Sequence, residues 1–244
     1  MGRGRYRTGR LARTRVRVMT RTARRSPTRV GASAAAVTEQ TRIYAERALD
    51  LVPQLREEIG APRTASGSPA LVVLMGYPGV GKSHCARLLA ARLGAAHIAS
   101  DQLRSRLFIA ATYTDAENAT IFRCVDALVA GLLRDGHRVI VDATNLVSRN
   151  RAGSVAAAAR AGVPIVFVRV VADDTVIRVR LAQRRASRAA DDHSDADERV
   201  YERMRGRPFE PPAGGHLELV NDDAIEIAID RIASEVERRC VSAM

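Results

Sequence analysis

The residues with the clearest chemical meaning form a glycine-rich run with the spacing G-x-x-x-x-G-K-S. It consists of Gly76, Tyr77, Pro78, Gly79, Val80, Gly81, Lys82 and Ser83. Glycines let such a loop turn its backbone N–H groups inward, toward phosphate oxygens. The ammonium of Lys82 is predicted to reach the β- and γ-phosphates of a nucleoside triphosphate, and the Ser83 hydroxyl to bind Mg²⁺. The pattern therefore predicts a site for ATP or a related triphosphate with Mg²⁺, extending to His84.

Two aspartates follow short apolar segments. Asp142 ends the segment 139–141, and an aspartate so placed beside a phosphate loop holds Mg²⁺, so Asp142 is predicted to share the metal with Ser83. Asp101 follows the segment 96–99, and Arg104 lies on the same face three residues later if a helix begins there. A carboxylate near an acceptor hydroxyl can take its proton, which suits Asp101. Alternatively, Asp101 or Ser100 caps the following helix.

Arginines gather on a later segment that leads into a polar, Asp-rich stretch at 191–198. They are Arg180, Arg184, Arg185 and Arg188. Arginine stabilises the negative charge that spreads over a phosphoryl group during its transfer. We therefore predict an Arg-rich helical lid, with Arg180 on the phosphates and Arg184 among the catalytic residues together with Asp101 and Lys82. For any one of these arginines, the alternative is a solvated helix face.

The elements that must position these residues alternate between strand and helix. Strands are predicted at 70–75, 96–99, 139–141, 164–171 and 216–220, and helices at 83–93, 116–134, 149–161, 175–188 and 224–239. This alternation indicates an α/β fold, a P-loop NTPase three-layer sandwich with a parallel five-stranded sheet and helices on both faces. A helix is also predicted at 38–59, with a break or kink at Pro53, before a linker at 60–69.

The charge of the chain is unevenly distributed. The formal net charge is +12, but residues 1–30 hold 11 arginines and no acid, and residues 31–244 hold 28 basic and 27 acidic residues. We divide the chain into a disordered basic tail (1–33), a helix and linker (34–69) and a catalytic domain (70–244). The tail is an arm for nucleic acid, a transit peptide, or the product of a start codon placed upstream of Met19. The remainder is nearly neutral, and Lys82 is the only lysine among 39 basic residues.

Cysteine, histidine and apolar residues indicate no further site. Cys85, Cys124 and Cys240 lack metal spacing and are predicted to be buried, reduced thiols of a cytoplasmic protein. The five histidines likewise lack metal-ligand spacing, and structural or surface roles are expected for them. No run of 18 apolar residues exists, so no membrane-spanning helix and no membrane partner are predicted.

Several motifs occur together in an order that resembles a known family. The phosphate loop is followed by Ser100–Arg104, Val141–Asn145, Arg180–Arg184, Ser194–Asp197 and Glu210–Pro212. Over roughly residues 70–221 the chain resembles P-loop kinases related to polynucleotide 5′-hydroxyl kinase and to zeta-toxin-like kinases, with an AAA-type ATP-binding domain. The resemblance implies that Asp101 is the general base and that Arg104 contacts the acceptor. It places His84 where the family usually has Thr.

The resemblance leaves the acceptor open. Asn145, Arg149 and Arg151 are further candidates for acceptor contacts. The leading expectation is an ATP- and Mg²⁺-dependent kinase of a hydroxyl on a small molecule or a polynucleotide 5′ end. The first alternative is a P-loop NTPase switch with a nucleic-acid-binding basic arm, which would not need an acceptor pair such as Asp101 and Arg104. The second is a toxin-like kinase of a nucleotide sugar.

Overall fold

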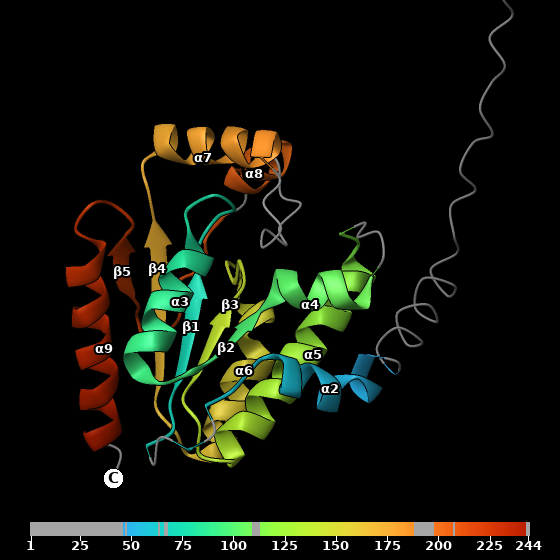
Figure 1. Ribbon diagram of the computed structural model, residues 1–244, viewed down its shortest axis with the longest axis vertical. Helices are drawn as coiled ribbons and strands as arrows, with labels where there is room; N and C mark the ends of the chain where they lie inside the picture. The colour runs from blue at the N-terminus through green and yellow to red at the C-terminus, as the bar shows by residue number, and fades with distance from the viewer. Residues whose placement is uncertain are drawn as a thin grey trace, which may run out of the picture.

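The computed structural model describes residues 46, 48–62, 64–65, 68–108, 113–187, 198–206 and 208–242. The predicted basic tail and most of the Asp-rich stretch lie outside these residues. The strands are β1 (Leu71–Met75), β2 (Ala96–Ala99), β3 (Val139–Asp142), β4 (Ile165–Val171) and β5 (Leu217–Val220). The main helices are α2 (Val52–Glu58), α3 (Lys82–Leu93), α4 (Ser100–Leu107), α5 (Asp115–Arg134), α6 (Ser148–Ala161), α7 (Asp174–Ser187), α8 (Glu198–Arg205) and α9 (Ile225–Ser242) (Figure 1).

The five strands form one parallel sheet in the order β2-β3-β1-β4-β5, which confirms the predicted fold class. The central strands β1 and β3 are buried along their whole length, because helices cover both faces of the sheet. Leu74 lies opposite Asp142, and Asp142 lies opposite Ala99. This register brings the carboxyl ends of β1, β3 and β2 to the same edge of the sheet.

Two apolar layers fill the space between the sheet and its helices. On one face, Val72 and Leu74 of β1 pack with Leu89 of α3 and Ile232 of α9. On the other face, Leu71, Val73 and Met75 pack with Leu128 and other residues of α5 and with alanines of α6. Figure 1 shows α3 and α9 on one side of the sheet and α5 and α6 on the other, with α7 and α8 across the carboxyl ends of the strands. The apolar layers thus lie on the two faces of the sheet, and polar residues such as Asp142 lie at the carboxyl ends of the strands.

The structure also differs from the predicted elements. Residues 198–205 form the helix α8, which the sequence did not predict. Residues 100–107 form the helix α4, which the sequence indicated only as one possibility for Asp101 and Arg104. The predicted break near Pro53 is present: residues 48–50 are helical, residue 51 forms a turn, and α2 begins at Val52. Pro53 occupies the first turn of α2, where a proline costs no hydrogen bond. Leu55 of α2 is buried against α5, so the segment that precedes β1 packs onto the domain.

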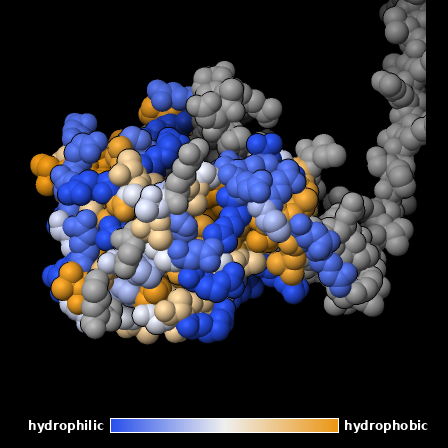
Figure 2. All heavy atoms as spheres, turned by 60° about the horizontal axis from the view of Figure 1, so that its bottom comes forward, coloured by the Kyte–Doolittle hydropathy of each residue, from blue (hydrophilic) through white to orange (hydrophobic). Residues whose placement is uncertain are grey.

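The surface drawn in Figure 2 mixes hydrophilic residues with small hydrophobic patches. In the described part of the chain, no helix has both the length and the apolar character needed to cross a bilayer.

Candidate functional site

The glycine-rich run forms a loop between β1 and α3, as its spacing predicted. Gly79 (φ +82°) and Gly81 (φ +91°) have left-handed backbone conformations, which glycine adopts without a steric penalty. A Cβ atom at Gly79 would lie 2.9 Å from the side chain of Ile177 in α7, so the loop packs closely against that helix. Because α3 begins at Lys82, the amino end of a helix faces the interior of the loop, which favours a bound anion.

Lys82 and its neighbours occupy the start of α3. The Lys82 ammonium donates a hydrogen bond to the carbonyl oxygen of Tyr77 at 2.9 Å, folding the side chain back over the loop. Tyr77 packs its ring edge-on against Tyr201 of α8, with ring centroids 6.3 Å apart. Pro78 and Val80 are buried, whereas Ser83 and His84 are exposed. The loop therefore offers a cation, a hydroxyl and a helix end on one side.

Asp142 is the buried carboxylate of the site, with 4% of its surface exposed. Burial by itself raises the pKa of this carboxyl, but hydrogen bonds from His97 and Ser83 and the positive charge of Lys82 outweigh it and hold the pKa below its usual value. Asp142 is therefore ionised at neutral pH. Its contact with Ser83 places a carboxylate and a hydroxyl together, which are the hard oxygen ligands that Mg²⁺ prefers.

His97 is a site residue that sequence reasoning missed. Its Nε2 atom lies 3.3 Å from Oδ2 of Asp142. The contact follows from the strand pairing, since Ala99 lies opposite Asp142 and His97 lies two residues earlier on the same face of β2. No local motif marks His97, so only the knowledge that β2 pairs with β3 could have identified it. Among the described residues, no group of three or more His, Cys, Asp or Glu side chains forms a metal cluster.

Asp101 and Arg104 lie on α4, which begins directly after β2. Asp101 is in the first turn, two residues after Ala99, and is half-buried. Arg104 is 7% exposed, and its Nη2 donates to Oδ1 of Asn118 at 2.7 Å. Its guanidinium also lies 3.5 Å from Glu117 and 4.5 Å from the ring centre of Tyr113. The structure thus places Asp101 at the sheet edge but directs Arg104 toward the start of α5.

Asn145 and Arg151 have structural contacts. The Asn145 amide donates to the carbonyl oxygen of Leu74 at 2.9 Å, and its backbone φ is +47°. The buried Arg151 donates to the carbonyl oxygens of Asn145 at 2.5 Å and Glu210 at 2.7 Å. These bonds fasten the loop after β3 to β1 and to the segment before β5. Arg149, in the same helix α6, has an exposed side chain.

The Arg-rich helix of the predicted lid is α7, and α8, which was not predicted, packs against it. Nη1 of Arg180 donates to the carbonyl oxygen of Val80 in the phosphate loop at 3.3 Å. Arg184 lies in α7, but its side chain, like those of Arg185 and Arg188, is outside what the structure describes. Asp174 of α7 ties the two helices together: it accepts a hydrogen bond from Tyr201 at 2.5 Å and forms an ion pair with Arg205 at 3.4 Å, and both partners lie on α8.

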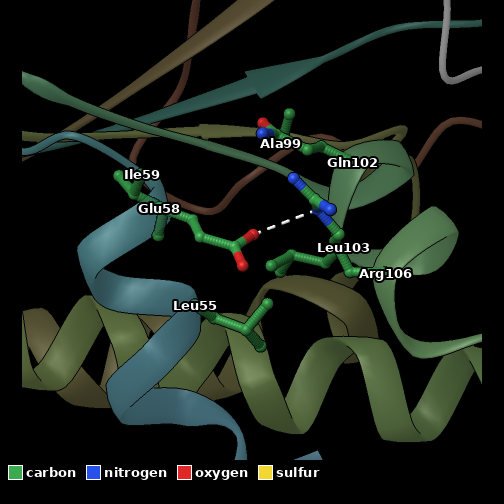
Figure 3. Close-up of a pocket in the computed structure, with 7 residues that line it drawn as sticks. All are labelled: Leu55, Glu58, Ile59, Ala99, Gln102, Leu103 and Arg106. Atoms are coloured by element: carbon green, nitrogen blue, oxygen red, sulfur yellow. Dashed lines mark ion pairs between the residues drawn. The ribbon is translucent and has the colours of Figure 1, made fainter.

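The remaining candidates are the three cysteines and a small surface recess. All three cysteines are buried and free, and burial raises the pKa of Cys85 and of Cys124 to about 11. A small recess separates α2 from α4, and Glu58 and Arg106 form an ion pair across it at 3.0 Å (Figure 3). It is lined by Leu55, Glu58, Ile59, Ala99, Gln102, Leu103 and Arg106. These residues do not include the phosphate loop.

Comparisons with known proteins give the family and support the fold. Residues 71–212, more than half of the chain, match the family described as "AAA domain". No curated protein matches the chain. An APS kinase of Mycobacterium tuberculosis, solved with AMPPNP and APS, is 24% identical with a TM-score of 0.53 over 70% of this chain and 98% of that chain.

Two further solved structures are similar. Kti12 of Chaetomium thermophilum, in complex with ADP-AlF3, is 20% identical with a TM-score of 0.54 over 70% of this chain and 98% of that chain. A sugar kinase of Janibacter sp. HTCC2649 is 17% identical with a TM-score of 0.51 over 72% of this chain and 99% of that chain. At these identities the similarity establishes a shared fold.

Proposed function

We propose, since the chain belongs to the AAA domain family, that it is an ATP-dependent kinase that transfers the γ-phosphoryl group to a hydroxyl of a small molecule or of a polynucleotide 5′ end. One observation carries the proposal: the nucleotide-side and acceptor-side groups share one sheet edge. Ser83 contacts Asp142, and the strand partner of Asp142 is Ala99, two residues before Asp101. A hydroxyl near Asp101 would therefore lie beside the phosphates held by the loop.

On the nucleotide side, the loop N–H groups and Lys82 would bind the β- and γ-phosphates. Ser83 and Asp142 would hold Mg²⁺, which when bound neutralises negative charge on these phosphates. Arg180 already lies against the loop, and Arg184 follows it one turn later on α7. We assign Arg180 to phosphate binding and Arg184 to stabilising the charge on the transferred group. His84, exposed in the first turn of α3, completes the nucleotide side.

On the acceptor side, Asp101 would accept the proton of the attacking hydroxyl as the oxygen–phosphorus bond forms and the bond to the ADP leaving group breaks. Arg149 is exposed and would bind the acceptor directly. Arg104 and Asn145 remain proposed acceptor contacts, although the groups described above hold Arg104 at α5 and Asn145 at β1. Both therefore also shape the walls of this side.

We favour a small-molecule acceptor over a polynucleotide. Residues 31–244 have 28 basic and 27 acidic residues, and a polynucleotide would call for a more basic surface. The similar structures include an APS kinase and a sugar kinase, which fits the same choice. Membership of the subgroup of polynucleotide or zeta-toxin-like kinases rests on the motif order, and a cytoplasmic location rests on the free cysteines.

The test is transfer of labelled γ-phosphate from ATP to a pooled metabolite extract and, separately, to a 5′-hydroxyl oligonucleotide. The wild type would be compared with Asp101→Asn, which removes the base but preserves shape, and with Asp230→Asn on the outer surface of α9. We expect Asp101→Asn to lower transfer about 10²- to 10⁴-fold with unchanged ATP affinity, and Asp230→Asn to transfer normally. ATP hydrolysis without a labelled acceptor, equal in all three proteins, would refute the kinase and favour the NTPase switch.

A further inference from the structure

The carbonyl oxygen of Val80, in the middle of the phosphate loop, accepts hydrogen bonds from two distant elements. The Asn221 amide nitrogen donates to it at 2.7 Å, and Nη1 of Arg180 donates at 3.3 Å. Asn221 follows β5, 141 residues after Val80. The shorter bond comes from the side chain that is 6% exposed, where water cannot replace a lost partner.

Asn221 is itself fixed to the sheet. Its backbone N–H donates to the carbonyl oxygen of Val171 at 2.9 Å, which continues the pairing of β4 with β5 by one residue. The side chain therefore extends from a rigid strand end toward the loop. A short amide on such a support loses little conformational freedom when it bonds. Arg180, in contrast, reaches the same carbonyl from α7 with a long side chain.

The geometry of the peptide bond converts this contact into an effect on the opposite side of the loop. In a planar trans peptide the C=O and the following N–H point in opposite directions. A donor that holds the Val80 carbonyl toward the sheet therefore directs the Gly81 N–H away from it, into the loop. The absence of a side chain at Gly81 leaves room for Asn221, because a Cβ atom at Gly81 would lie 2.0 Å from the Asn221 amide nitrogen. A side chain at residue 81 and the amide at 221 are mutually exclusive.

We propose that Asn221 is a positioning residue for nucleotide binding, which orients the Val80–Gly81 peptide so that the Gly81 N–H is aimed at a phosphate oxygen. The proposal rests on the proposed nucleotide binding but not on the kinase reaction. It explains why an amide is present rather than a carboxylate, because aspartate would place an oxygen against the Val80 carbonyl oxygen. It also makes the orientation of the Val80 carbonyl independent of α7, because the bond from Asn221 does not involve Arg180.

The experiment measures the affinity for Mg-ATP and for Mg-tripolyphosphate by calorimetry in the full-length wild type, Asn221→Ala and Asn221→Asp. We expect Asn221→Ala to weaken both ligands by the same factor, about tenfold, because the contact acts on phosphate alone. We expect a larger loss with Asn221→Asp, whose volume is unchanged but whose carboxylate repels the carbonyl. The ¹⁵N-labelled Gly81 amide should shift on addition of Mg-ATP in the wild type and shift less in the variants.

Two control variants separate positioning from loss of folding. Asp223→Asn changes an exposed carboxylate two residues away and should bind both ligands as the wild type does. Val236→Ala removes buried volume from α9 and should lower the melting temperature without changing the affinities. Wild-type affinity in Asn221→Ala and Asn221→Asp, or a loss confined to Mg-ATP, would overturn the inference while nucleotide binding stood. Failure of the wild type to bind either ligand would overturn the proposed function and this inference with it.

Discussion

The two sides of the site are supported by strands with different surroundings. The phosphate loop leaves β1, which pairs with β3 and with β4, whereas Asp101 follows β2, an edge strand that pairs with β3. Around the loop, the side chains of Lys82, Asn221 and Arg180 all bond to its backbone carbonyls. On the proposed acceptor side, the polar groups of Arg104 and Asn145 instead hold neighbouring elements in place. The loop backbone is thus held by side chains from α3, α7 and the residue after β5, whereas Arg104 and Asn145 join neighbouring elements to one another.

The largest expected effect tests the loop side. Lys82→Ala removes the only lysine and with it the ammonium that is proposed to bridge the β- and γ-phosphates. We expect phosphate transfer to fall about 10³-fold, because charge stabilisation of this kind is worth several kcal/mol in a site closed to water. Lys82→Arg should recover little of this loss, since a planar guanidinium does not fit a loop built around a point charge. The measurement is initial-rate transfer of labelled phosphate, and recovery to near the wild-type rate by Lys82→Arg would contradict the expectation.

The next effect tests whether Arg104 supports the structure of the proposed acceptor side. Arg104→Ala would leave Glu117 buried without its cation and the Asn118 oxygen without its donor. We expect about 3 kcal/mol loss of unfolding free energy, measured by urea denaturation, as is usual when one partner of a buried ion pair is removed. The matched variant Arg149→Ala alters an exposed arginine and should leave stability within about 0.5 kcal/mol. Equal stability of the two variants would show that Arg104 is not a structural support.

The smallest effect concerns the ion pair that joins Glu58 of α2 to Arg106 of α4. Glu58→Gln breaks the ion pair with Arg106 across the recess in Figure 3. Because the Arg106 side chain is 60% exposed, we expect a loss of at most about 0.5 kcal/mol, measured by thermal unfolding at low and high salt. The difference from the wild type should vanish at high salt, where exposed charges are screened. A loss of several kcal/mol would mean that α2 supports α4 as strongly as α5 does.

Particular elements show why sequence reasoning succeeded for the loop and fell short elsewhere. The phosphate loop is a local pattern, and its flanking strand and helix follow it directly, so spacing alone located it. The segments of β1 and β3 were recognisable because both strands are buried along their whole length, which makes them nearly continuous apolar runs. The contacts of His97 with Asp142 and of Asn221 with Val80 join residues 45 and 141 positions apart, and each depends on the strand order. Local spacing contains no information about that order.

The same reason accounts for the acceptor residues. Spacing placed Arg104 on the same helix face as Asp101, and the helix α4 exists. The neighbours of the Arg104 guanidinium depend on how α5 packs against α4. In this packing the guanidinium has a hydrogen bond to Asn118, an ion pair with Glu117 and the ring of Tyr113 beside it. The roles of Asp101, Arg149 and Arg184 in catalysis or binding stay predictions.

The position of Lys82 has a practical consequence for chemical labelling. Because the chain has one lysine, an amine-directed reagent has a single side-chain target, and peptide mapping separates it from the terminal amino group. The Lys82 ammonium lies within the phosphate loop, bonded to Tyr77. A nucleotide that carries an acylating group on its terminal phosphate would therefore leave its mark at one residue. The fraction of molecules modified would then serve as a direct readout of site occupancy, even in a mixture and without knowledge of the acceptor.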